Sequence, residues 1–173
     1  MIDLQSQLKE AIAAASRKDF DLALTLCGEA IEEFPGLPDG FRTRSQVYRL
    51  MGDVGKAIDD RTMAIRIGAE SVDYFFRGWW RFDDGDLESA LTDLSTAITL
   101  EKDSAVHAST ESALFFRALT LLRLGRFDDA LADCANVRDE FVIYVRGLGR
   151  FSKMELVACA TNRNSDPSES IAS

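Results

Sequence analysis

The 173-residue sequence predicts an all-α protein made of consecutive helical hairpins. The first observation is a turn followed by an amphipathic helix, which is clearest at residues 83–98 and recurs three more times. The second is the spacing of the anchoring alanines, 34, 33 and 40 residues, because a period near 34 is typical of two-helix repeats. The third is a matched set of small side chains, which allows helices to pack closely. The anchors are Ala23, Ala57, Ala90 and Ala130. Twelve residues before them stand Ala11, Ser45, Gly78 and Ala118. Seven residues after the first three anchors stand Ala30, Ala64 and Ala97.

Each repeat is predicted to contain two helices that bury their apolar sides only against the next repeat, so stacking in sequence order is expected. The cluster Pro35-Gly36-Leu37-Pro38-Asp39-Gly40 separates the first two repeats. Extra residues between Glu101 and Glu111 form either a longer loop or a continuation of the preceding helix. The repeats cover approximately residues 4–37, 38–70, 71–110 and 111–139. The predicted helices are residues 4–16, 20–34, 40–51, 54–67, 72–83, 86–101, 112–124 and 127–139.

The residues after the fourth repeat begin an incomplete fifth copy. Arg146-Gly147-Leu148-Gly149-Arg150-Phe151 matches Arg77-Gly78-Trp79-Trp80-Arg81-Phe82 at four of six positions. We therefore predict a capping helix over residues 140–160, which would cover the apolar end of the array. Residues 1–160 would then form one array, and the polar residues 161–173 a disordered tail.

This pattern resembles the tetratricopeptide-repeat family over roughly residues 4–140. The shared features are a small residue midway along the first helix, a Gly-Asp/Asn-Tyr/Phe turn and two alanines on the second helix. The chain departs from the family where the helix-ending proline occurs only as Pro35 and where Lys18 replaces the turn glycine of the first copy. The resemblance implies a right-handed α-α superhelix, a solenoid of about four hairpins. It also implies that the first helices line a concave groove that holds a peptide or a partner helix.

Helical spacing indicates which side chains would line that groove. The second repeat would contribute polar and basic residues, and the third and fourth mainly aromatic and apolar ones. Aromatic clusters at helical spacing also occur in cores, and the C-terminal segment with Ile143, Tyr144 and Leu148 would occupy the groove if it folded back over it. The candidate partner-binding residues are Arg42, Gln46, Arg49, Phe75, Phe76, Trp79, Phe82, Phe115, Phe116, Leu119 and Arg123.

An arginine and an aspartate recur together in the second, third and fourth repeats. The arginine precedes the small residue of the first helix, and the aspartate lies three residues after the anchoring alanine. Both are missing from the first repeat, which has Glu10 and Leu26 at these positions. The co-occurrence predicts structural ion pairs that orient the helices, with ligand binding as the alternative. The residues are Arg44, Arg77 and Arg117 with Asp60, Asp93 and Asp133.

Composition argues against several classes of partner. A net charge of −9 and a pI near 4.6 would repel the phosphates of nucleic acids. No apolar run approaches the roughly 20 residues that cross a bilayer, and the N-terminus lacks the layout of a signal peptide, so we expect a cytoplasmic protein without membrane contact. Cys27, Cys134 and Cys159 have no CxxC spacing, which favours small core residues over a redox role.

Residues suited to catalysis are few. The one histidine, His107, falls in the insert after the third repeat and is predicted to be a solvated loop residue. Asp83, Asp84 and Asp86 lack the spacing of a calcium loop and suit a turn and a helix cap. We therefore predict a protein-interaction adaptor without enzymatic activity, cofactor or metal. The alternatives are a dedicated chaperone or an inhibitor of immunity type for a single partner, and a structural homodimer formed through the aromatic face.

Overall fold

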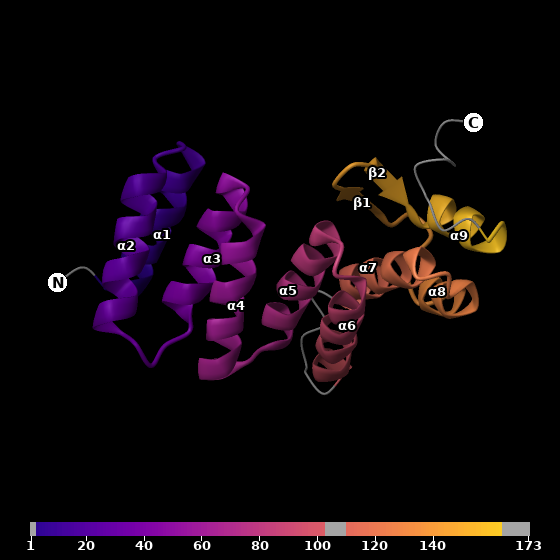
Figure 1. The fold of residues 1–173 in the computed structure, drawn as a ribbon, viewed down its shortest axis with the longest axis horizontal. Coiled ribbons are helices and arrows are strands. Elements are labelled where there is room, and N and C mark those ends of the chain that lie inside the picture. The colour runs from indigo at the N-terminus through magenta and orange to yellow at the C-terminus, as the bar shows by residue number, and fades with distance from the viewer. Residues whose placement is uncertain (1–2, 103–109, 164–173) are drawn as a thin grey trace. The chain divides into compact units, whose positions relative to one another are not determined.

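The computed structural model describes residues 3–102 and 110–163, and Figure 1 shows the order of their elements. Helices follow one another in pairs joined by short turns, which confirms the predicted all-α hairpin fold. The first six predicted helices agree with the structure to within one residue at each end. The elements are α1 Leu4–Ser16, α2 Phe20–Glu33, α3 Asp39–Met51, α4 Val54–Gly68, α5 Ser71–Asp84, α6 Leu87–Lys102, α7 Thr110–Arg123, α8 Phe127–Cys134, β1 Val142–Val145, β2 Gly149–Ser152 and α9 Lys153–Thr161.

The turn inside each hairpin forms because one residue adopts a left-handed backbone conformation. In three hairpins this residue is a glycine, which has no Cβ to clash there. These glycines are Gly52, Gly85 and Gly125, with φ of 87°, 89° and 74°. After Gly52 and Gly85 the next helix is capped by an aspartate, as where Asp53 accepts a hydrogen bond of 3.1 Å from the amide of Lys56. In the first hairpin Lys18 adopts this conformation with φ 66°, which costs roughly 1 kcal/mol relative to glycine.

The chain divides into two compact units, residues 1–80 and 81–173, and the boundary falls inside α5. In the first unit α1 packs against α2 and α3, α2 packs against α3, and α3 packs against α4 (Figure 1). The helices approach closely because small side chains fill the contacts between them. One core cluster of this unit consists of Ala11, Ala14, Ala15, Ala23, Cys27 and Val47. A second cluster joins Trp80 of α5 to Val54 and Ala57 of α4.

The second unit is organised around α7, which packs against α6, α8 and α9. Aromatic rings fill much of its core. The Phe115 ring centroid lies 5.3 Å from that of Phe141 and 6.3 Å from that of Phe151. On the neighbouring position of α7, Phe116 meets Phe82 edge-on with centroids 5.8 Å apart. The C-terminal segment is therefore part of the core of this unit.

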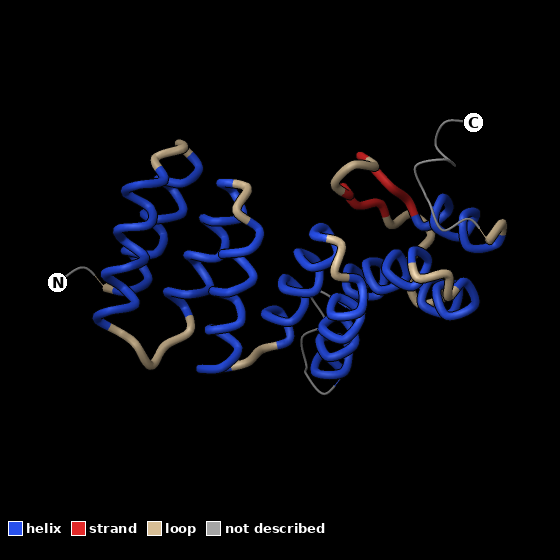
Figure 2. Tube along the Cα trace, in the orientation of Figure 1, coloured by secondary structure: helices blue, strands red, loops and turns tan. Residues whose placement is uncertain are grey.

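The predicted capping helix over residues 140–160 is wrong for residues 142–152, which form an antiparallel β-hairpin (Figure 2). The run Val-Ile-Tyr-Val in β1 favours a strand because β-branched and aromatic side chains pack well on a pleated surface. Gly147 and Gly149 have φ of 85° and 77°, which a right-handed helix does not accommodate. Only α9 is helical, and a capping box between Ser152 and Glu155 starts it. The similarity to residues 77–82 therefore reflects sequence alone.

The eighth helix is also shorter than predicted, since α8 ends at Cys134 and not at residue 139. Beyond this end the chain turns, and the carbonyl of Val137 accepts a hydrogen bond of 2.6 Å from Lys153 Nζ. The same ammonium group pairs with Asp139 at 2.8 Å. A side chain from the start of α9 thus satisfies a backbone carbonyl in the turn that follows α8.

Three predictions fall wholly or mostly outside the described residues: the form of the insert after α6, the setting of His107, and the disordered tail. Cys27, Cys134 and Cys159 are buried free thiols, and burial raises the pKa of Cys27 to about 12 and that of Cys134 to about 11. Within residues 3–102 and 110–163, no cluster of His, Cys, Asp or Glu has the grouping of a metal site. Over the same ranges, no helix is both long and apolar enough to cross a membrane.

Candidate binding groove of the first unit

The first unit carries an apolar hollow of about 390 Å³ along its first helices. Its walls come from α1, α3 and α5, the first helices of three consecutive repeats. Five of the seven lining side chains are aliphatic or aromatic. The lining residues are Ile12, Gln46, Arg49, Leu50, Phe76, Trp79 and Trp80. We call this hollow the α1–α3–α5 groove.

The aromatic wall of the groove is a contiguous ring cluster on α5. The Phe76 ring stacks on Trp79 with centroids 6.2 Å apart and lies 5.7 Å from Trp80. Trp80 is 2% exposed and packs into the core on α4, whereas Phe76 and Trp79 are only partly buried. Across the groove, Leu50 of α3 is 57% exposed. The groove therefore joins a fixed aromatic wall to an exposed aliphatic side chain.

The aromatic wall is supported from behind by a buried guanidinium group. The Arg61 side chain is 1% exposed, and its Cζ lies 5.1 Å from the Phe76 centroid and 5.2 Å from the Trp80 centroid. Arg61 also donates a hydrogen bond of 2.9 Å to Asp73 Oδ1. Burial lowers the pKa of Arg61, and the bond to Asp73 opposes that shift. The charge thus holds two of the groove's rings in place.

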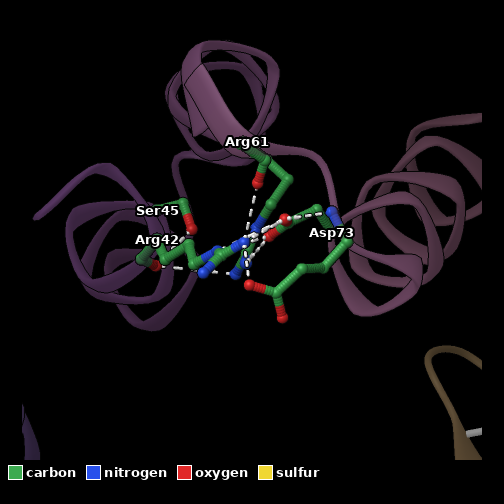
Figure 3. Close-up of polar contacts among 6 residues, drawn as sticks. Arg42, Ser45, Arg61 and Asp73 are labelled. Atoms are coloured by element: carbon green, nitrogen blue, oxygen red, sulfur yellow. Dashed lines mark hydrogen bonds and ion pairs between the residues drawn. The ribbon is translucent and has the colours of Figure 1, made fainter. Parts of the chain in front are cut away.

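Asp73 is the centre of a charged cluster that joins α3, α4 and α5 (Figure 3). Its carboxylate is fully buried and accepts hydrogen bonds from Arg61 and from Arg42, whose Nη2 lies 2.7 Å from Oδ2. Burial alone would raise the pKa of Asp73, but the hydrogen bonds from the two arginines outweigh it and hold the pKa below its ordinary value. Arg42 also donates to the Gly68 carbonyl at 2.9 Å and pairs with Glu70 at 2.7 Å.

This cluster was not predicted from the sequence, although the sequence contains one signal for it. Asp73, Phe76 and Trp80 share one face of α5 at spacings of three and four residues, so a carboxylate stands within an apolar helical stripe. A charge in such a stripe requires a buried partner. The sequence does not identify Arg61 as this partner because α3 and α4 carry several other arginines, such as Arg44 and Arg66.

A second, more polar hollow of about 290 Å³ continues from Ile12 along α1 and α3. Arg42 lines it while remaining bound to Asp73. Lys9 and Asp39 place charges of opposite sign on its walls. The first unit therefore presents a surface that changes from charged to aromatic along the same helices.

The structure brings together four of the predicted groove residues, Gln46, Arg49, Phe76 and Trp79. Arg42 is nearby but belongs to the Asp73 cluster, and Phe75 and Phe82 are 7% and 4% exposed. Arg123 is exposed, with its guanidinium 5.2 Å from the Phe82 centroid. The remaining predicted residues, Phe115, Phe116 and Leu119, are fully buried in α7. These three reach a ligand only if the core around α7 opens.

The predicted Arg–Asp pairs are confirmed in the second and fourth repeats. Arg44 binds Asp60 through two hydrogen bonds of 2.7 and 2.8 Å, and Arg117 binds Asp133 through two of 2.8 and 2.6 Å. In the third repeat Asp93 accepts a bond of 2.8 Å from Arg81. Each bidentate pair joins the two helices of one hairpin, which supports the structural interpretation.

A hollow of about 350 Å³ on the second unit is lined largely by such paired charges. Arg117 is bound to Asp133, and Arg126 is bound to Asp129 at 2.7 Å. Ligand binding there would have to compete with these ion pairs. The α1–α3–α5 groove is therefore the stronger candidate.

Comparison with known proteins supports the same fold. No family model matches the chain. Human tetratricopeptide repeat protein 13 is 24% identical over 136 residues, which cover 77% of this chain but only 15% of that protein. The MamA structure aligns with a TM-score of 0.75 and 15% identity over 98% of this chain and 86% of MamA. YrrB, described as a TPR protein with an unusual peptide-binding site, aligns with a TM-score of 0.70 and 18% identity over 98% of this chain and 84% of its own.

The four copies of the repeat, the paired helices and these structural neighbours agree with one another. The resemblance inferred from the sequence is thereby confirmed: the chain has the tetratricopeptide-repeat fold.

Proposed function

We propose that the chain is a protein-interaction module that holds a partner segment in the α1–α3–α5 groove. The observation that carries the proposal is the groove itself, an apolar hollow formed by three first helices with Leu50 largely exposed at its edge. Exposed apolar surface of this kind usually marks a binding site in soluble proteins. The aromatic wall needs no rearrangement because Arg61 and Trp80 already hold it.

The lining residues favour a partner segment with an apolar anchor side chain. Phe76, Trp79 and Leu50 offer aromatic and aliphatic contact, and Gln46 and Arg49 place polar groups beside it. An amphipathic helix or an extended peptide presents this combination. The lining set contains no histidine, thiol or carboxylate, so we assign the groove binding and no chemical step. The description of YrrB as having a peptide-binding site gives the proposal a precedent in a protein of the same fold.

The test uses a displayed library of random peptides, selected on the full chain. The informative variant is Leu50→Asp, because Leu50 is exposed and its replacement leaves the core intact. The matched control is Leu22→Asp on α2, where the leucine is 39% exposed and outside the groove. We expect the selected peptides to carry an apolar anchor and to bind Leu50→Asp about tenfold more weakly, as measured by calorimetry, because a carboxylate replaces apolar contact.

The control should bind these peptides as the unchanged protein does. Equal affinity for the protein and for Leu50→Asp, or failure to select any apolar-anchored peptide, would refute the proposal.

A further inference from the structure

The β-hairpin of the second unit presents an open strand edge that the proposed groove does not use. The amide of Lys153 donates a hydrogen bond of 3.1 Å to the carbonyl of Phe141. This bond shows which residue pairs of the hairpin are hydrogen-bonded to each other. Since bonded and non-bonded pairs alternate in an antiparallel ladder, Ile143 and Val145 bond toward β2. The backbone groups of Val142 and Tyr144 therefore point away from β2. Within the described part of the chain, they accept and donate no further main-chain hydrogen bond.

The two edges of the hairpin differ. On the β2 side, the amide of Ser152 donates 2.7 Å to Glu155 Oε2, and β2 packs against α9. The edge of β2 is thus partly closed by its own chain. Among the described residues, none covers the edge of β1 in this way. Natural proteins usually protect exposed strand edges because these edges pair with other strands.

The side chains on the outer face of β1 are unusually exposed for their type. Val142 is 42% and Tyr144 69% exposed, while Val145 on the opposite face is 1% exposed. Exposed β-branched and aromatic side chains on a strand stabilise cross-strand pairing. Both the backbone edge and the side chains of β1 are therefore suited to receive a further strand.

We propose that the strand received is β1 of a second copy, paired antiparallel about a two-fold axis at Ile143. This register places Val142 opposite Tyr144 of the second copy, and these are the residues whose backbone groups point outward. Each such pair exchanges two N–H···O=C hydrogen bonds, and the two hairpins become one four-stranded sheet.

The charges beside β1 select this arrangement over others. Continued past the ends of β1, the proposed register brings Glu140, two residues before the strand, level with Arg146 of the second copy, the first residue after it. The two-fold symmetry repeats this contact. Glu140 is exposed and forms only a long ion pair of 3.9 Å with Arg138, which binds Glu111 at 2.8 Å. Arg146 is exposed and makes no ion pair within the described residues. The neighbouring register, with Val142 opposite Val142, would place Arg146 opposite Arg138. Parallel pairing in register would place arginine beside arginine. The flanking charges thus complement a second copy of this chain.

The test is analytical ultracentrifugation of the full chain over a concentration series extending to about 0.5 mM, because an interface this small gives a weak dimer. We expect a monomer–dimer equilibrium that Tyr144→Pro abolishes. Proline removes an amide that points outward, so the hairpin itself keeps its ladder. Tyr144→Thr, which retains the amide and a β-branched side chain, is the control and should still dimerise.

A charge exchange tests the register independently of the proline. We expect Glu140→Arg and Arg146→Glu each to weaken the dimer roughly fivefold at low salt, and the double exchange to restore it. A general effect of net charge would behave differently, because the first change makes the acidic protein less charged and the second makes it more so. A chain that stays monomeric at every concentration would overturn the proposal. So would a dimer whose affinity is unchanged by Tyr144→Pro and by both charge changes.

Discussion

Helices α5 and α7 occupy corresponding places in the third and fourth repeats, yet their aromatic faces differ in exposure. Phe76 and Trp79 on α5 are partly exposed and line the groove, whereas the matching Phe116 and Leu119 on α7 are fully buried. The sequence pattern of the two helices is similar. In the second unit Phe116 packs edge-on against Phe82, and α7 packs against α6, α8 and α9.

This comparison shows that a repeat specifies an apolar face but not whether that face stays open. In the second unit Phe141 and Phe151 reach the Phe115 ring, and α9 packs against α7. In the first unit the corresponding face borders a hollow. The same repeat pattern therefore borders an apolar hollow in one unit and a closed core in the other.

The largest effect is expected for Phe151→Ala, which removes a buried ring from the covered face. We expect the free energy of unfolding to fall by about 4 kcal/mol, since truncating a buried phenylalanine loses burial and leaves a cavity. Urea denaturation of the full chain measures it. Phe20→Ala, on a partly buried ring of α2, is the comparison and should cost clearly less. A loss at Phe151 within the range of about 0.5 kcal/mol typical of surface changes would mean that its ring does not stabilise α7.

Asp73→Asn tests the support behind the open face. We expect a loss of about 3 kcal/mol, because the amide leaves the charges of Arg61 and Arg42 uncompensated in a buried site. Asp59→Asn, an exposed aspartate of α4, should change stability by less than about 0.5 kcal/mol. A loss at Asp73 as small as that at Asp59 would remove the charged cluster from the account of the groove.

The difference in stability between the unchanged protein and Asp73→Asn should depend on pH in a defined direction. The pKa of Asp73 is lowered below 3.8 in the folded state, so its stabilisation is present in full above the unfolded-state value. It is lost as the pH falls through the lower folded-state value. Denaturation curves of the unchanged protein and Asp73→Asn should therefore differ most near neutrality and converge below about pH 4. A stability difference that grows on acidification would contradict the assignment.

Trp79→Leu should give the smallest change in stability of these variants. It places on α5 the residue type that α7 has at the matching position, which is leucine. We expect a loss of about 1 kcal/mol in stability, since Trp79 is only partly buried. Affinity for peptides selected on the groove should fall about tenfold because the aromatic wall loses a ring. Unchanged affinity, measured by calorimetry at a temperature where both proteins are folded, would move the binding site away from Trp79.

Much of the architecture could be predicted because it is local and repeated. The alanine anchors and the turn residues mark the helices, and the recurrence of Arg44 with Asp60 and of Arg117 with Asp133 predicted pairs that the structure contains. The C-terminal segment was predicted incorrectly because its match to residues 77–82 outweighed the strand-forming run of β1. The Asp73 cluster was missed because its members lie on three different helices.

By itself, the sequence determined the helices, their pairing into hairpins and the presence of an apolar face on each repeat. These properties follow from helical periodicity and backbone conformation, which depend on residues close together in the chain. The tertiary structure decided which face is covered, which arginine meets Asp73 and where a strand edge stays open. Burial and charge pairing depend on groups that approach only after folding, and similar local patterns therefore end in a core at α7 and in a groove at α5.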